Sequence, residues 1–127
     1  MIDKEKEVFD AVAGALRAKF KDIYVVGTEL ASTPPRFPAV SLVQTNNATR
    51  AEHATFFCLE NVAQEDYKAE VFSNLETGKA SQTKEITAVI SDAMRDLGYA
   101  RTFCEVILNI DPTINRRVSR YRKNTVI

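Results

Sequence analysis

The chain has 127 residues and a mass of 14.2 kDa, and its 17 basic side chains equal its 17 acidic ones. This length predicts a single domain, 1–127, because one core normally organises about 100–200 residues. The balanced charge does not support binding to nucleic acid or a membrane surface through a large basic excess. The apolar runs are far shorter than the roughly 20 residues of a spanning helix, and the charged start, 3–7, argues against a secretory signal. We therefore expect a protein that resides in a cytoplasm and has no membrane partner.

An amphipathic helix is predicted near the start of the chain, over about 3–20. Val8, Val12 and Leu16 recur at helical spacing with charged residues between them. Gly14 lies inside this segment, where glycine costs about 1 kcal/mol relative to alanine. A close packing contact at Gly14 would explain its presence.

Strand patterns follow the first helix. Residues 23–26 are β-branched or aromatic and are typical of a short strand. The prolines within 34–38 exclude a helix. Apolar residues then support strands over 39–43 and about 62–72.

A second amphipathic helix is predicted over about 81–97, with Gly98 as its C-terminal stop. A strand from about 102 to 108, a turn near Asp111-Pro112 and a last extended segment from 114 to about 124 follow it. Most of the strands are consecutive, which favours antiparallel pairing. The sequence thus predicts an α+β domain with a mainly antiparallel sheet of about four to five strands and two helices packed on it.

Known chemical motifs are incomplete in this chain. Thr77-Gly78-Lys79 precedes a helix, as in a phosphate-binding loop, but Ser73 stands where that motif needs glycine and Ala80 where it needs a hydroxyl. We expect a polar turn there. The single histidine, His53, has no partner at a spacing that marks a nucleophile or a zinc site, so a surface histidine is the simpler interpretation.

The remaining candidate groups also give no active site. Cys58 and Cys104 are far apart in sequence and are better explained as small buried side chains than as a disulfide. Glu65 and Asp66 are neighbours in a strand, so their side chains should point to opposite faces and cannot act together on one substrate. We expect no catalytic residue, no cofactor and no metal.

The connection from Thr45 to Asn61 is long for a compact domain and carries apolar residues, including Phe56 and Phe57. Apolar side chains at a loop tip favour a partner contact. Alternatively, residues 55–59 begin the next strand and pack on the core.

The C-terminal segment is basic, with Arg116, Arg117, Arg120 and Arg122 and no acid after Asp111. Strand alternation puts Arg116, Arg120 and Arg122 on one face and Arg117 on the other. Arginines with their stems along apolar neighbours are typical of subunit interfaces. Phosphate contact is an alternative, and so is a solvated edge strand whose charge prevents aggregation.

The order and spacing of several strings resemble a small family of tail proteins of tailed bacteriophages and prophages of Gram-positive bacteria, the tail terminator, also called the tail completion or tail-to-head joining protein. The resemblance covers nearly the whole chain. The strings are Phe37-Pro38-Ala39-Val40-Ser41, Tyr67-Lys68-Ala69-Glu70-Val71-Phe72-Ser73-Asn74, Thr77-Gly78-Lys79, Gly98-Tyr99-Ala100-Arg101-Thr102-Phe103 and Arg117-Val118-Ser119-Arg120-Tyr121-Arg122.

This resemblance implies a structural virion protein that forms a ring, a homohexamer, on the last ring of the tail tube. The ring would end tube growth and present the surface that joins the head. It implies the tail tube protein and head–tail connector proteins as partners, and location in the virion tail after assembly in the host cytoplasm. Other head–tail connector, tail tube or minor capsid roles stay open, as does a small nucleic-acid-binding module that uses the basic strand.

In such a ring, the terminal arginines of one subunit would meet acids of the next. The candidate acids are at the start of the first helix (Asp3, Glu5, Glu7 and Asp10) and in the Glu65-Asp66 pair. Pairs at an exposed rim are screened by salt.

Overall fold

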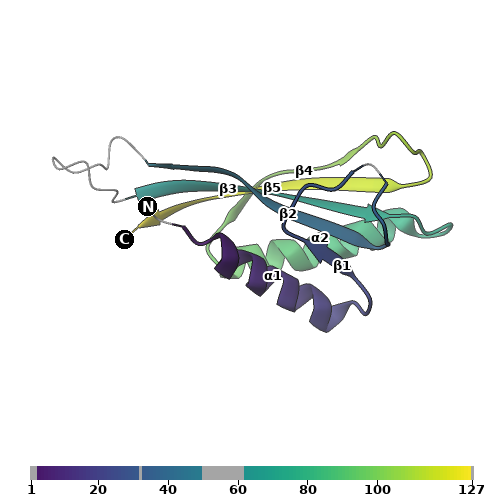
Figure 1. Ribbon diagram of the computed structural model, residues 1–127, viewed down its shortest axis with the longest axis horizontal. Coiled ribbons are helices and arrows are strands. Elements are labelled where there is room, and N and C mark those ends of the chain that lie inside the picture. Colours follow the sequence, from purple (N-terminus) through teal and green to yellow (C-terminus); the bar gives the residue numbers. More distant parts are fainter. Residues whose placement is uncertain (1–2, 32, 50–61, 127) are drawn as a thin grey trace.

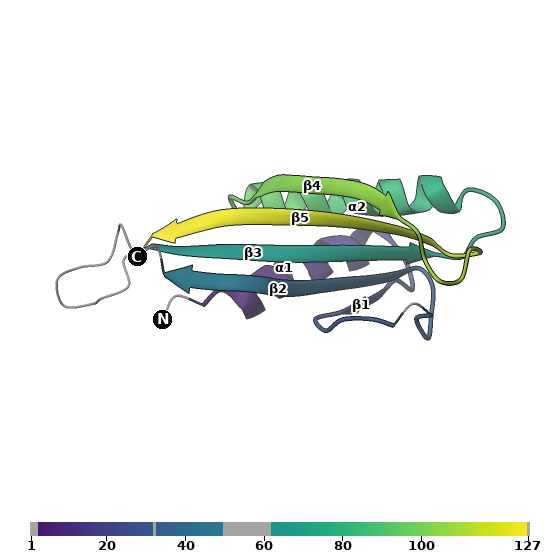
Figure 2. The ribbon, with the colours of Figure 1, turned by 90° about the horizontal axis from the view of Figure 1, so that it is seen from above.

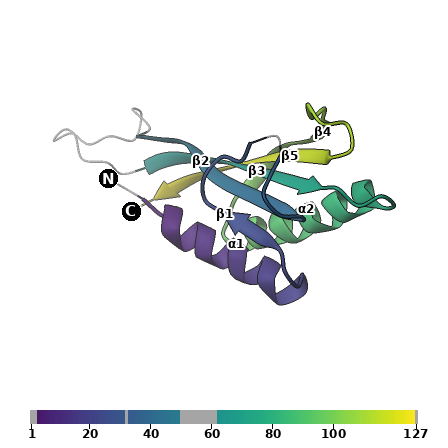
Figure 3. The ribbon, with the colours of Figure 1, turned by 45° about the vertical axis from the view of Figure 1, so that its right-hand side comes forward.

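The computed structural model describes residues 3–31, 33–49 and 62–126. The elements in chain order are α1 (Glu5–Lys19), β1 (Tyr24–Val26), β2 (Ala39–Thr49), β3 (Val62–Ser73), α2 (Lys79–Asp96), β4 (Ala100–Ile107) and β5 (Asn115–Val126). The strands form one sheet in the order β1-β2-β3-β5-β4, which Figure 2 shows from above. Both helices lie on one face of this sheet (Figures 1 and 3). The predicted α+β class is confirmed.

The sheet is mixed, not purely antiparallel. β2 with β3, β3 with β5 and β5 with β4 are antiparallel, which agrees with the predicted mainly antiparallel sheet. β1, however, pairs parallel to β2. The connection over 27–38 separates these two strands, and a dozen or so residues are enough for the crossover that parallel strands need.

The main core lies between the helices and the sheet. Val12 and Leu16 of α1 and Ile90 of α2 are fully buried, because the apolar stripe of each helix faces the sheet. The strands contribute Tyr67 and Tyr121, which are also buried. We call this sheet surface the covered face and the opposite surface the open face.

β2 extends further than the sequence predicts. Its polar residues beyond Val43 pair with β3 as far as Thr49, after a register shift between Gln44 and Asn46. Backbone pairing does not require apolar side chains, so this half of the strand carried no hydrophobic signal. The connection predicted from Thr45 to Asn61 therefore begins too early, because the residues up to Thr49 belong to β2.

A second, smaller core lies on the open face. Ala39, Phe72 and Ile114 are buried there, and Leu30 and Phe37 of the 27–38 connection pack against them. A hydrogen bond holds the connection against β2: the Ser41 hydroxyl donates to the Thr28 carbonyl at 2.8 Å. One end of the open face is thus shielded from solvent.

Two glycines behave differently from each other. Gly98 ends α2 with a φ of +93°, a left-handed conformation that glycine adopts readily, and this agrees with the predicted stop. A Cβ at Gly14 would meet no atom within 4 Å. The expectation of a close packing contact at Gly14 is wrong.

Candidate interface surfaces

Alternation along β5 places the basic residues on both faces of the sheet, as the sequence predicts. Arg116 lies opposite Phe72, and Arg122 lies opposite Asp66, both on the open face. Arg117 lies opposite Val71, a residue of the main core, so the Arg117 side chain leaves the backbone on the covered face. The four arginines therefore do not form one surface.

Glu70 is the centre of an ion-pair network on the open face. Its side chain is 4% exposed. Arg116 donates to Glu70 Oε2 from Nε at 2.7 Å and approaches it through Nη2 at 2.5 Å. Lys68 Nζ lies 3.0 Å from Glu70 Oε1 and 2.5 Å from Glu29 Oε1. The hydrogen bond between Lys68 and Glu29 lowers the pKa of Glu29 and raises that of Lys68.

A second pair lies further along the same face. Arg122 Nε donates to Asp66 Oδ1 at 2.7 Å, and Asn46 donates to Asp66 Oδ2 at 3.2 Å. Partial burial opposes ionisation of Asp66, but the hydrogen bonds from Arg122, Asn46 and Gln64 outweigh it and keep the pKa of this carboxyl below its ordinary value. Asp66 is thus an ionised partner of Arg122 within its own chain.

These pairs change the interface that the sequence suggested. Arg116 and Arg122 already have carboxylate partners in the same chain, so Asp66 is not a free acid for a neighbouring subunit. Arg120 is exposed and has no ion pair within the part of the chain that the structure describes. Of the candidate arginines, Arg120 is the one best placed to meet a partner.

Glu65 faces the other way and is fully buried. It lies opposite Lys123 and accepts a hydrogen bond from the Tyr99 hydroxyl at 2.9 Å. Burial and this hydrogen bond both raise the pKa of Tyr99. Lys123 Nζ instead donates to the Leu97 carbonyl at 2.7 Å. The neighbours Glu65 and Asp66 point to opposite faces, as predicted, and Glu65 cannot reach another subunit.

The acids at the start of α1 remain at the surface. Asp3 Oδ1 accepts a hydrogen bond from the Glu5 backbone N–H at 3.0 Å. Glu7 and Asp10 make exposed ion pairs with lysines three and four residues earlier. Such pairs contribute little to stability, so these acids can exchange partners. Their contact with a neighbouring subunit stays a prediction.

Within residues 3–31, 33–49 and 62–126, the most exposed large apolar side chains lie on the connection between β4 and β5, residues 108–114, which we call the β4–β5 hairpin. Leu108 is 94% exposed and Ile110 is 89% exposed. Leu108 falls in the strand predicted over about 102–108, and no role is predicted for Ile110 from the sequence. The sequence signal for this exposure is a pair of aliphatic residues just before the turn at Asp111-Pro112, where no neighbouring strand can cover them.

The Thr77-Gly78-Lys79 segment supports this hairpin. Gly78 has a φ of +84° at the start of α2, and Lys79 Nζ donates to the Thr113 carbonyl at 3.1 Å. The lysine thus ties the start of α2 to the hairpin, which agrees with the predicted polar turn.

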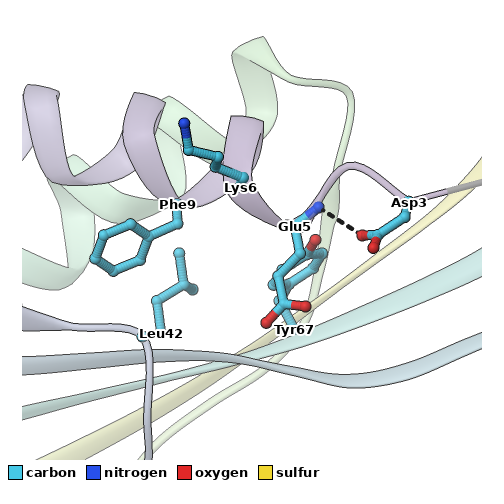
Figure 4. A pocket seen from close by; sticks show the side chains of 7 residues that line it. Asp3, Glu5, Lys6, Phe9, Leu42 and Tyr67 are labelled. Carbon is cyan, nitrogen blue, oxygen red and sulfur yellow. Dashed lines mark hydrogen bonds between the residues drawn. The ribbon is translucent and has the colours of Figure 1, made fainter.

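A cavity of about 340 Å³ opens between the start of α1 and the edge of the sheet at β2. We call it the α1–β2 cavity. Phe9, Leu42 and Tyr67 supply its apolar walls, and Asp3, Glu5 and Lys6 stand near its rim (Figure 4). Gly27 completes the lining.

Several candidates from the sequence lie outside the described residues, namely His53, Phe56, Phe57 and Cys58. Cys104, which is described, is partly buried and carries a free thiol. Among residues 3–31, 33–49 and 62–126, no three or more His, Cys, Asp or Glu side chains gather as metal ligands would. Within the same ranges, neither helix combines the length and apolar character needed to cross a membrane.

Comparison with models of known protein families gives no match, and no curated protein matches the sequence.

Proposed function

We propose that this chain is a structural subunit that assembles as a ring, capping a bacteriophage tail tube and providing the surface that joins the head. The observation that carries the proposal is the β4–β5 hairpin, whose Leu108 and Ile110 project almost fully into solvent. Large aliphatic side chains exposed together are typical of protein–protein contact sites. A subunit that acts by docking needs such a surface.

The position of the resembling strings supports the same proposal. The string 67–74 lies mainly in β3, the string 98–103 leads into β4, and the string 117–122 lies in β5. These three strands are neighbours in the sheet. The resemblance to tail terminators therefore falls on one continuous part of the fold.

The ion pairs made by the arginines of β5 favour protein docking over nucleic-acid binding. Arg116 and Arg122 each contact a carboxylate of β3, and these pairs would have to break before the guanidinium groups could contact phosphate. A small basic module that binds duplex DNA should show an affinity that falls steeply with salt. A gel shift at low and at moderate salt separates the two functions, and we expect no shift at either.

The direct test uses a tail tube protein from the genome that encodes this chain. We expect tubes polymerised with the purified full chain to be shorter than tubes grown without it, and to carry a cap at one end in electron micrographs. Equal length distributions and bare tube ends would contradict the proposed function. The other tail and connector roles predict binding to tubes or connectors without arrest of growth.

A further inference from the structure

We propose that the β4–β5 hairpin of one copy inserts Leu108 and Ile110 into the α1–β2 cavity of a second copy, so that the subunits join head to tail. The proposed ring does not specify which surfaces of neighbouring subunits meet, and this contact specifies them. Only the closure of the joined subunits into a ring rests on the proposed function.

The hairpin is suited to insertion because its backbone is held in place. The Thr113 backbone N–H and hydroxyl both donate to Asp111 Oδ1, at 2.9 and 2.7 Å. The Ile114 N–H donates to the Asp111 carbonyl, and Lys79 binds the Thr113 carbonyl from outside. A preorganised segment loses little conformational entropy when it docks. Burial of two exposed aliphatic side chains then drives the contact.

The cavity matches the two aliphatic side chains of the hairpin in size and in apolar character. Its volume of about 340 Å³ is at the small end of the range for ligand pockets, which suits one or two aliphatic side chains. Phe9 and Leu42 lie close together in its lining, as Figure 4 shows. Asp3 and Glu5 near the rim are complementary to Lys79 at the base of the hairpin.

The two surfaces cannot meet within one chain. The hairpin lies at one end of the sheet, whereas the start of α1, which lines the cavity, lies toward the other end (Figure 1). A contact between two different surfaces of identical subunits is heterologous, and repeats of it close into a ring or continue as a filament. A second copy is therefore the occupant that fits both the exposed hairpin and the cavity.

Two variants of the full chain test the contact. The first, Leu108→Asp with Ile110→Asp, makes the hairpin polar at positions that contribute no burial. The second, Gly27→Leu, fills the cavity from within. A Cβ at Gly27 would lie 3.5 Å from Phe9 Cδ2, which is ordinary contact, and the rest of the leucine side chain would occupy the cavity space that Gly27 lines. Leu75→Asp is the matched control, because Leu75 is also an exposed leucine, on the loop before α2.

Sedimentation velocity should show self-association weakened at least tenfold in each variant and unchanged in the control. Mixing the two variants should restore a 1:1 dimer, since the cavity-filled copy still has an intact hairpin and the hairpin variant still has an open cavity. Circular dichroism on every sample checks the fold.

Site-specific cross-linking keeps the test decisive if Gly27→Leu unfolds. Both native cysteines are first replaced, by Cys58→Ser and Cys104→Ser. Two protein samples are then prepared in this background: one pool carries Ile110→Cys on the hairpin, and the other pool carries Lys6→Cys at the cavity rim. We expect a disulfide between the pools and none within either pool. Cross-links within the Ile110→Cys pool alone would instead indicate hairpin-to-hairpin contact and overturn the inference.

The outcomes separate this inference from the proposed function. If both variants form rings as the wild type does, the inference fails and the ring function stands. If the mixed dimer forms but the wild type gives open filaments, the inference stands and the ring function fails. A wild type that stays monomeric at every concentration overturns the inference, and the tube-capping assay then decides the function by itself.

Discussion

The two faces of the sheet both bury a carboxylate, and the two carboxylates have different partners. On the covered face, Glu65 Oε2 receives one hydrogen bond from the neutral Tyr99 hydroxyl, and Glu65 Oε1 has no hydrogen-bond partner among the described residues. On the open face, Glu70 lies between two cations, Lys68 and Arg116. The covered face is enclosed by two helices, whereas the open face is shielded only in part, by the 27–38 connection. The comparison indicates that packing holds one face together and ion pairing orders the other.

The largest expected effect tests the packing of the covered face. Ile90→Ala removes a fully buried side chain of α2, and such deletions cost about 2–5 kcal/mol because the cavity closes only in part. Leu108→Ala is the matched control on the exposed hairpin and should change the free energy of unfolding by less than about 0.5 kcal/mol. Urea denaturation at a dilution where the chain is monomeric measures both. Equal effects would show that Leu108 packs within its own subunit.

The next effect tests the ion pairs of the open face. Glu70→Ala should cost about 3 kcal/mol, because it leaves Arg116 and Lys68 without their shared partner in a partly buried place. Glu29→Ala removes the exposed partner of Lys68 and should have a much smaller effect, because exposed ion pairs contribute little to stability. If the two substitutions have the same small effect in chemical denaturation, ion pairing does not order this face.

A somewhat smaller effect is expected at the buried carboxylate of the covered face. Tyr99→Phe removes the hydroxyl that donates to Glu65, and the loss of a hydrogen bond to a buried group costs about 1–3 kcal/mol. Tyr24→Phe, at a half-buried tyrosine of β1, is the control and should be nearly neutral. Thermal unfolding followed by circular dichroism compares them. A neutral Tyr99→Phe would mean that Glu65 does not depend on this bond.

The smallest effect concerns pH. The pKa of Asp66 is lower in the folded chain than its ordinary value, so the unfolded chain binds more protons as the pH falls. The contribution of Asp66 is therefore fully present above the unfolded pKa, near 4, and is lost as the pH falls through the lower folded value. Asp66→Asn should cost about 0.5 kcal/mol at pH 7, and this cost should shrink as the pH falls through the folded pKa of Asp66. A cost that is constant with pH would contradict the ion pair with Arg122.

Much of the fold follows from local patterns. The helical spacing of Val12 and Leu16 predicts the buried stripe of α1, and alternation alone separates Arg116 from Arg117. These features depend only on the geometry of one helix or one strand. They therefore need no knowledge of which segments meet in space.

The features that sequence missed depend on distant segments. Arg116 and Glu70 are 46 residues apart, and nothing local indicates that they pair. The parallel pairing of β1 is set by the path of the 27–38 connection, not by the composition of the strand. The exposure of Leu108 and Ile110 depends on the absence of a neighbour at the hairpin, whereas an apolar residue in a sequence pattern is normally assigned to the core.

Negative-stain electron microscopy of the purified wild-type chain tests the central claim most directly. If subunits dock hairpin to cavity and close around an axis, the images should show uniform rings, with about six subunits each as the resemblance to tail terminators implies. A field of single small particles even at high protein concentration would contradict the account.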